Sequence, residues 1–221
     1  MDKENYKENY KLFSVKKTVL QLLKDRNYDI SDEEKIFSMD LETFNEYREK
    51  LSEEKALNNR RCLSNIYSKN LSSDKILVFF TDNVNKKKQI PLETIKIFMK
   101  EIAENNTQEA ILIINTNLSS KSLEALRELT LVYWQFFYDS DLTYNPVLHR
   151  DVPKHELLTE SEKNDKIKEL RTSVSKLPII KFTDPIVRYY GWKRGDLIRI
   201  TREDTALSCL VPISINYRIV I

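Results

Sequence analysis

The sequence predicts an α/β domain followed by a small α+β domain, and five stretches carry that prediction. Residues 75–80 and 109–115 are continuous apolar runs, which is typical of strands buried on both faces. Residues 91–104 between them carry apolar side chains at helical spacing, so the three stretches predict a strand–helix–strand unit with parallel strands. Further on, residues 184–191 have the start and stop signals of a short helix, and an alternating strand follows over 197–201.

Helices dominate the region before the first apolar strand. Residues 10–24 have apolar side chains at helical spacing, and residues 41–51 repeat that pattern over a shorter length. Ser31 to Glu34 has the spacing of a capping box, which predicts a short helix beginning there. Residues 52–73 are polar and rich in Asn and Ser, so we expect part of them to be loop.

The second half of the first domain continues the alternation of helix and strand. Pro91 is expected at the first position of its helix, since that position needs no backbone N–H. Residues 120–129 predict another helix, and the aromatic-rich residues 131–142 predict a strand or mixed structure. The expected first domain, residues 1–144, is thus α/β with a mixed sheet.

Two prolines, Pro146 and Pro153, interrupt the pattern over residues 145–155, which predicts a domain boundary there. The second domain then covers residues 145–221. Thr159 and Glu162 form a second capping box, which predicts a helix running to about residue 171.

Composition narrows the class of protein. The 221 residues carry a net charge of +2, with 41% hydrophobic and 32% charged residues, so no global field favours nucleic acid or a membrane surface. Cys62 and Cys209 make no disulfide framework and favour a reducing compartment. No apolar run approaches the roughly 18 residues of a membrane span, and the charged N-terminus is unlike a signal peptide. We therefore expect that the protein does not associate with membranes. We expect it to work in the cytosol, in the nucleus or in a particle assembled there.

Two short basic stretches could contact a nucleic acid locally. Lys86, Lys87 and Lys88 lie in the turn after the first strand and could clamp a phosphate backbone, although such a turn is more often a solvated tip. The same two interpretations stand for Arg60 and Arg61.

The C-terminal block is the most specific feature of the chain. It holds the only two glycines, Gly191 and Gly195, and glycine is needed where backbone geometry demands it. Asp184 suits a helix N-cap, Pro185 the first helical turn, and Gly191 the position just past the helix end. Aromatic residues interleaved with arginines suit a protein interface, or the core of the small domain, and we expect both uses.

An enzyme is the alternative interpretation. A metal-dependent DNA-processing enzyme on the α/β domain would need an Asp on one strand and Glu-x-Lys on the next. Asp74 and Asp82 bracket the first strand, but the second strand has no Glu-x-Lys. His149 and His155 are the only histidines and have no ligand cluster beside them, so they are expected to satisfy backbone groups. We therefore expect no catalytic residues, no metal site and no cofactor.

The order and spacing of the C-terminal motifs resemble the fifth common subunit of eukaryotic nuclear RNA polymerases, whose C-terminal domain is equivalent to a small subunit of the archaeal RNA polymerase. The N-terminal half is similar more loosely, over 19–28, 78–80, 95–96 and 110–112. One departure is at Thr205-Ala206, where the family continues with a glycine and this chain does not. The matching residues are His149, Val152-Pro153-Lys154-His155, Leu177-Pro178 with Ile180, Asp184-Pro185, Arg188-Tyr189-Tyr190-Gly191, Lys193-Arg194-Gly195 and Tyr217-Arg218.

The resemblance implies a non-catalytic subunit of a multisubunit DNA-directed RNA polymerase. Its N-terminal jaw domain would lie near downstream duplex DNA, with Lys86, Lys87 and Lys88 as peripheral, non-specific contacts. Its C-terminal assembly domain would anchor on the largest subunit and contact other subunits. The protein would be located in the nucleus if it is cellular. If its divergence from the family pattern reflects a large DNA virus that has its own polymerase, it would be located in the host cytoplasm and the virion. The partner-binding residues expected are Asp184, Pro185, Arg188, Tyr189, Tyr190, Gly191, Lys193, Arg194, Gly195, Tyr217 and Arg218.

Overall fold

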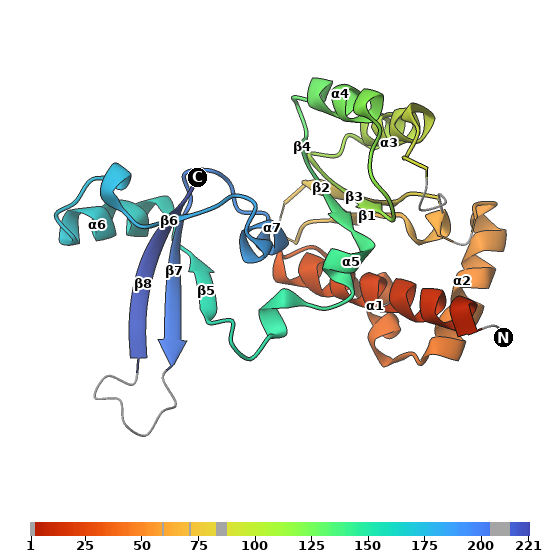
Figure 1. The fold of residues 1–221 in the computed structure, drawn as a ribbon, viewed down its shortest axis with the longest axis horizontal. Coiled ribbons are helices and arrows are strands. Elements are labelled where there is room, and N and C mark those ends of the chain that lie inside the picture. Colours follow the sequence, from red (N-terminus) through yellow and green to blue (C-terminus); the bar gives the residue numbers. More distant parts are fainter. Residues whose placement is uncertain (1–2, 59, 71, 83–87, 204–212) are drawn as a thin grey trace. The chain divides into compact units, whose positions relative to one another are not determined.

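The computed structural model describes residues 3–58, 60–70, 72–82, 88–203 and 213–221. The chain divides into two compact units, Met1–Tyr144 and Asn145–Ile221. Each unit has a four-stranded sheet of its own, and the helices of each pack around that sheet (Figure 1). The predicted fold class, an α/β domain followed by a small α+β domain, is confirmed.

The sheet of the N-terminal unit is mixed, as predicted. Its strands stand in the order β1 (Asn65–Ser68), β2 (Lys75–Phe80), β3 (Glu109–Ile114) and β4 (Tyr133–Tyr138). β1 runs antiparallel to β2, whereas β2, β3 and β4 are parallel to one another. The two apolar runs therefore pair side by side in the centre, where both of their faces are buried.

Helices cover both faces of this sheet. Figure 1 shows α3 (Leu92–Asn105) and α4 (Ser120–Glu128) on one side and α1 (Lys3–Asp25) with α2 (Leu41–Lys55) on the other. On the α3 side the core contains alternate residues of β2 and β3 packed against the inner face of the helix. These residues are Leu77, Phe79, Ala110, Leu112, Ile114, Ile95, Phe98 and Ile102.

Two details of the N-terminal unit, at Ser31 and at Pro91, differ from expectation, whereas the polar segment 52–73 and the aromatic segment 131–142 agree with it. Ser31 opens no capping box: η1 (Ser31–Ser38) is a 3₁₀ helix whose N-cap, Ile30, has no capping side chain, and Ser31 bonds to Asp29 instead. The polar segment expected to be partly loop contains η2 (Arg61–Leu63) and all of β1. Pro91 is the N-cap of α3 rather than its first residue. The aromatic segment is a strand, β4, followed by a single helical turn, α5 (Asp139–Leu142).

The sheet of the C-terminal unit has the order β5 (Lys154–Leu157), β7 (Leu197–Glu203), β8 (Ile213–Val220) and β6 (Ile179–Ile180). The first three strands are antiparallel, and β6 runs parallel to β8. β5 was not expected, because it begins inside the segment interpreted as irregular. The helices of the unit include η3 (Pro146–Leu148), α6 (Glu160–Glu169) and η4 (Val174–Lys176).

Each face of this second sheet has a small core. Ile198, Ile200 and Val220 pack on one face with residues of α7 (Pro185–Tyr190). Leu197 and Ile219 pack on the opposite face with Leu158, Leu177 and Ile167, the last of which is on α6. Among the described residues, no helix combines the length and apolar character needed to cross a membrane.

Candidate functional site

The start and stop of helix α7 are fixed by its neighbours in sequence. Asp184 accepts a hydrogen bond from the Ile186 N–H at 2.9 Å, and Pro185 occupies the first turn, as predicted. Gly191 has φ 71°, and its N–H donates to the Arg188 carbonyl at 3.2 Å. The next N–H, of Trp192, donates to the Val187 carbonyl at 3.1 Å, which completes a Schellman ending. The helix is thus held at both ends without help from a partner.

A tight turn connects this helix to β7. The Lys193 N–H donates to Asp196 Oδ2 at 2.7 Å, and the Gly195 N–H donates to the Val220 carbonyl at 2.9 Å. Gly195 has φ 94°, yet a Cβ there would meet nothing within 4 Å. Backbone conformation rather than space therefore requires glycine at this position. The bond to Val220 ties the turn to the end of β8, the strand that carries Tyr217 and Arg218.

The aromatic residues of the block divide between core and surface. Tyr189 is buried, and its hydroxyl accepts a hydrogen bond from Asn145 Nδ2 at 3.0 Å, so its direct contact with a partner is not supported. Tyr190 is half-buried and stacks on Trp192, with ring centroids 4.5 Å apart and planes 13° apart. Tyr217 is half-buried, with the Lys166 ammonium 5.1 Å from its ring centre. The aromatic residues thus serve mainly the domain's own packing.

The basic residues of the block are more open. Lys193, Arg194 and Arg218 are exposed, and Arg188 is half-buried. The Arg194 guanidinium lies 5.3 Å from the centre of the Phe182 ring, which orients it while leaving it accessible. The block therefore presents cationic side chains from a backbone that is already ordered.

The lysine turn is described only at its end. Lys86 and Lys87 lie outside the described residues, and Lys88 is exposed. The Lys88 carbonyl accepts a hydrogen bond from Thr116 Oγ1 at 3.0 Å, so this end of the turn is held beside the segment that follows β3. Lys88 is thus accessible at the edge of the sheet where β2 and β3 end.

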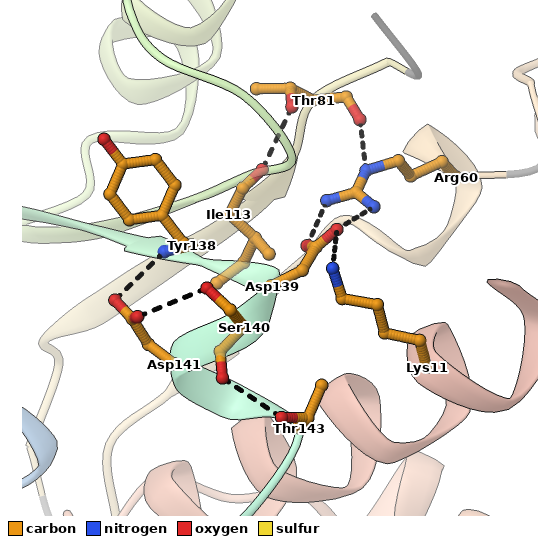
Figure 2. A network of polar contacts seen from close by, with 9 residues as sticks. All are labelled: Lys11, Arg60, Thr81, Ile113, Tyr138, Asp139, Ser140, Asp141 and Thr143. Atoms are coloured by element: carbon orange, nitrogen blue, oxygen red, sulfur yellow. Dashed lines mark hydrogen bonds and ion pairs between the residues drawn. The ribbon is translucent and has the colours of Figure 1, made fainter. Parts of the chain in front are cut away.

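Arg60 is not a surface residue but the centre of a buried network (Figure 2). Its guanidinium donates from Nη1 to Asp139 Oδ2 at 2.8 Å and from Nη2 to Asp139 Oδ1 at 2.5 Å, while Nε donates to the Thr81 carbonyl at 2.7 Å. Lys11 of α1 approaches Asp139 from the other side at 3.8 Å. Its neighbour Arg61 pairs with Glu101 at 2.9 Å. The interpretation of these two arginines as a nucleic-acid contact is therefore wrong, since both serve the fold.

A second buried network surrounds Lys16, which no sequence pattern indicated. Its ammonium is fully buried and lies 2.8 Å from Glu33 Oε2 and 3.0 Å from the Tyr67 hydroxyl, which also bonds to Glu33. Burial lowers the pKa of Lys16, and the Glu33 carboxylate only partly opposes that shift. Burial alone would raise the pKa of Glu33, but the Lys16 charge and the hydrogen bonds from Lys16 and Tyr67 outweigh it and lower that pKa. The pair is a buried link between α1 and η1.

Both histidines bond to nearby backbone groups, as expected. His155 Nδ1 lies 2.7 Å from the Pro153 carbonyl, and His149 Nδ1 accepts from the Asp151 N–H at 3.2 Å. Asp82, one of the two carboxylates considered for a metal, accepts a hydrogen bond from Asn58. Within the described ranges, no three His, Cys, Asp or Glu side chains are grouped so that they could hold a metal ion.

Two family models match the chain, one in each unit. The model described as RNA polymerase Rpb5, N-terminal domain, matches residues 6–102, and RNA polymerase Rpb5, C-terminal domain, matches residues 144–220.

Curated relatives match over most of their length. The DNA-directed RNA polymerases I, II, and III subunit RPABC1 of Caenorhabditis briggsae is 30% identical over 217 residues, 97% of each chain. Its Caenorhabditis elegans counterpart is 29% identical over the same span, and that of Dictyostelium discoideum is 28% identical over 195 residues, 87% of this chain and 90% of the relative. The chain therefore belongs to the Rpb5 family of RNA polymerase subunits.

Proposed function

We propose that this RNA polymerase subunit is non-catalytic, that its C-terminal unit anchors it on the largest subunit, and that its N-terminal unit forms part of the jaw near downstream DNA. One observation carries the proposal: the block from Asp184 to Gly195 holds exposed arginine and lysine side chains on a backbone fixed by its own caps. Relatives named as polymerase subunits support the setting. They give no support to a metal-dependent DNA-processing enzyme.

Arg188 and Arg194 are the proposed anchors. A guanidinium offers a planar set of donors that suits carboxylates and carbonyl groups of a partner. Because α7 and the Gly195 turn already order the two backbones, little conformational entropy remains to be lost on binding. Burial of such an arginine at an interface commonly contributes on the order of 2 kcal/mol or more.

The test replaces both arginines with Ala and measures how much chain is recovered with the polymerase. We expect recovery to fall while the thermal unfolding of the free protein stays unchanged. Arg150→Ala with Lys168→Ala is the matched control, since both are exposed cations of the same unit outside the block. If the Arg188→Ala, Arg194→Ala variant is recovered with the polymerase as well as the parent protein, the two arginines are not anchors. If the free variant protein is unfolded, the two arginines are structural.

We propose the lysine turn as a peripheral, non-specific DNA contact. Changing Lys86, Lys87 and Lys88 to Glu should weaken the polymerase–DNA complex at low salt and matter less at high salt, because phosphate contacts depend on counterion release. The same charge reversal at Lys96, Lys100 and Lys121, which are exposed elsewhere on the unit, controls for net charge. If the charge reversal at 86–88 weakens DNA binding no more than the control reversal does, the lysine turn is a solvated loop tip and makes no DNA contact.

We propose that the two units are separate folding domains, 1–144 and 145–221. Each has its own sheet and core, which is what independent folding requires. A fragment of residues 145–221 should therefore unfold cooperatively with heat, and a featureless melt would refute this division.

We propose that the chain works where its polymerase works: the nucleus in a cell, or the host cytoplasm and virion if it is viral. Mass spectrometry of RNA polymerase purified from nuclei distinguishes a cellular origin of this chain from a viral one. Peptides of this chain at constant stoichiometry would overturn the viral origin.

A further inference from the structure

Strand β8 has an open edge over most of its length. On one side it pairs with β7 from Ile213 to Ile219. On the other side β6 pairs only with Ile219 and Val220, at the very end of the strand. Among the residues that the structure describes, nothing pairs with the outer edge of residues 213–218.

The alternation of the strand identifies which backbone groups face that edge. The Ile219 N–H donates to the backbone carbonyl of Pro178, on the β6 side, at 2.9 Å. The Val220 N–H donates to the backbone carbonyl of Asp196, on the β7 side, also at 2.9 Å. Because successive residues of a strand point their N–H and C=O groups to opposite sides, Ile213, Ile215 and Tyr217 share the direction of Ile219. Their donors and acceptors therefore form a row along the open edge, which is a template for another strand.

The side chains beside this edge are not of the kind that blocks pairing. Ile213 and Ile215 are 51% and 53% exposed and lie on the same face as Tyr217. On the opposite face, β8 presents the exposed side chains of Ser214, Asn216 and Arg218, and the exposed Arg202 of β7 lies across from Ser214. One face of the edge strand is thus apolar, and the other is polar, with one arginine on β8 itself and a second on the neighbouring β7.

We propose that the open edge of β8 binds an extended segment of another polymerase subunit, added antiparallel or parallel as a further strand. The segment would have apolar residues alternating with acidic ones, so that the apolar residues cover Ile213 and Ile215 and the acidic ones face Arg202 and Arg218. Backbone hydrogen bonds would supply affinity and the alternation would supply specificity. The inference rests on the proposed function, because it takes the partner from the polymerase, but it uses none of the anchoring residues of α7.

Amide hydrogen exchange of the unaltered protein tests the edge directly. In the free chain the N–H groups of Ile215 and Tyr217 should exchange fast, and those of Asn216 and Arg218 slowly, since the latter pair with β7. On assembly into the polymerase, Ile215 and Tyr217 should slow by at least about tenfold. Unchanged exchange of these two amides in an intact complex overturns strand addition yet leaves the subunit assignment standing. A chain that never joins the polymerase overturns the proposed function and this inference with it.

A pair of substitutions at one position separates backbone from side chain. Ile215→Pro removes an N–H that points away from β7, which an edge strand tolerates, whereas Ile215→Thr keeps that donor and the β-branched shape. Both variants lose part of the apolar side chain, so a difference between them reports the backbone donor. The proline variant should bind the remaining subunits about tenfold more weakly than the threonine variant. Equal binding of the two variants overturns the proposal. So does slowed exchange that appears in the free chain at high concentration, because it would assign the edge to a second copy of this chain.

Discussion

Replacement of Asp139 by Asn should destabilise the N-terminal unit by about 3 kcal/mol, the lower end of the range for breaking a buried ion pair. Asn has nearly the same shape as Asp but no charge. The Arg60 guanidinium would therefore remain buried without its counter-ion, since both side chains are only 7% exposed. The Thr81 carbonyl holds Arg60 Nε at 2.7 Å, which keeps the guanidinium from turning out to water.

The magnitude follows from the contacts that are lost. Arg60 donates to both carboxylate oxygens, and a hydrogen bond between charged groups contributes about 1.5–3 kcal/mol. Asn keeps one oxygen as an acceptor, so one of the two bonds survives in weaker form. Lys11 adds little, because it is 3.8 Å from Asp139 and its side chain is 41% exposed and screened by water.

Tryptophan fluorescence can follow the unfolding of the N-terminal unit by itself. It has two tryptophans, and only Trp134 lies in the N-terminal unit, so its fluorescence during urea unfolding in a Trp192→Phe background reports that unit alone. Asp141→Asn is the matched control: the residue lies on the same helical turn but is exposed, and we expect a loss of at most about 1 kcal/mol. If Asp139→Asn costs no more than Asp141→Asn, the buried network does not stabilise the fold as argued.

Three further predictions concern other parts of the chain. The folded-state pKa of Glu33 lies below the ordinary 4.5, so its stabilisation is present above that pH and lost as the pH falls through the lowered value. Glu33→Gln should therefore lower the unfolding free energy at neutral pH by more than in acid, and a pH-independent difference would contradict the pairing with Lys16. Gly191→Ala should cost the C-terminal unit about 1 kcal/mol, because φ is 71° and a residue with a Cβ is disfavoured there. Thermal unfolding followed by Trp192 fluorescence in a Trp134→Phe background measures this cost, and an unchanged melting temperature would contradict it. Cys62 is buried and its pKa is raised by that burial, so iodoacetamide should label it slowly in the native protein and fast in urea, whereas equal rates by peptide mass spectrometry would show that the site opens.

Local sequence by itself determined the elements whose geometry depends on adjacent residues. Helix α7 begins and ends where Asp184, Pro185 and Gly191 indicate, because a cap bonds to backbone groups two or three residues away. The Thr159–Glu162 capping box likewise begins α6. The strands β2 and β3 were evident because their apolar runs are buried on both faces of a parallel pair.

The prediction of a capping box at Ser31 was wrong because Ser31 makes a different local hydrogen bond, to Asp29. Asp29, two residues earlier, accepts hydrogen bonds from both the backbone and the side chain of Ser31, and a 3₁₀ helix forms instead. Strand β1 was missed because its burial pattern comes from pairing with β2 rather than from its own short, polar-looking sequence.

Only the tertiary structure decided which polar residues are buried and which edge is open. Arg60 and Asp139 are 79 residues apart, and Lys16 and Tyr67 are 51 apart, so nothing in their neighbourhoods distinguishes them from surface charges. The same holds for β8, because the strands that lie beside it come from segments elsewhere in the chain. Pairing and burial depend on groups brought together by the whole chain, whereas caps and apolar periods depend on residues within one or two turns.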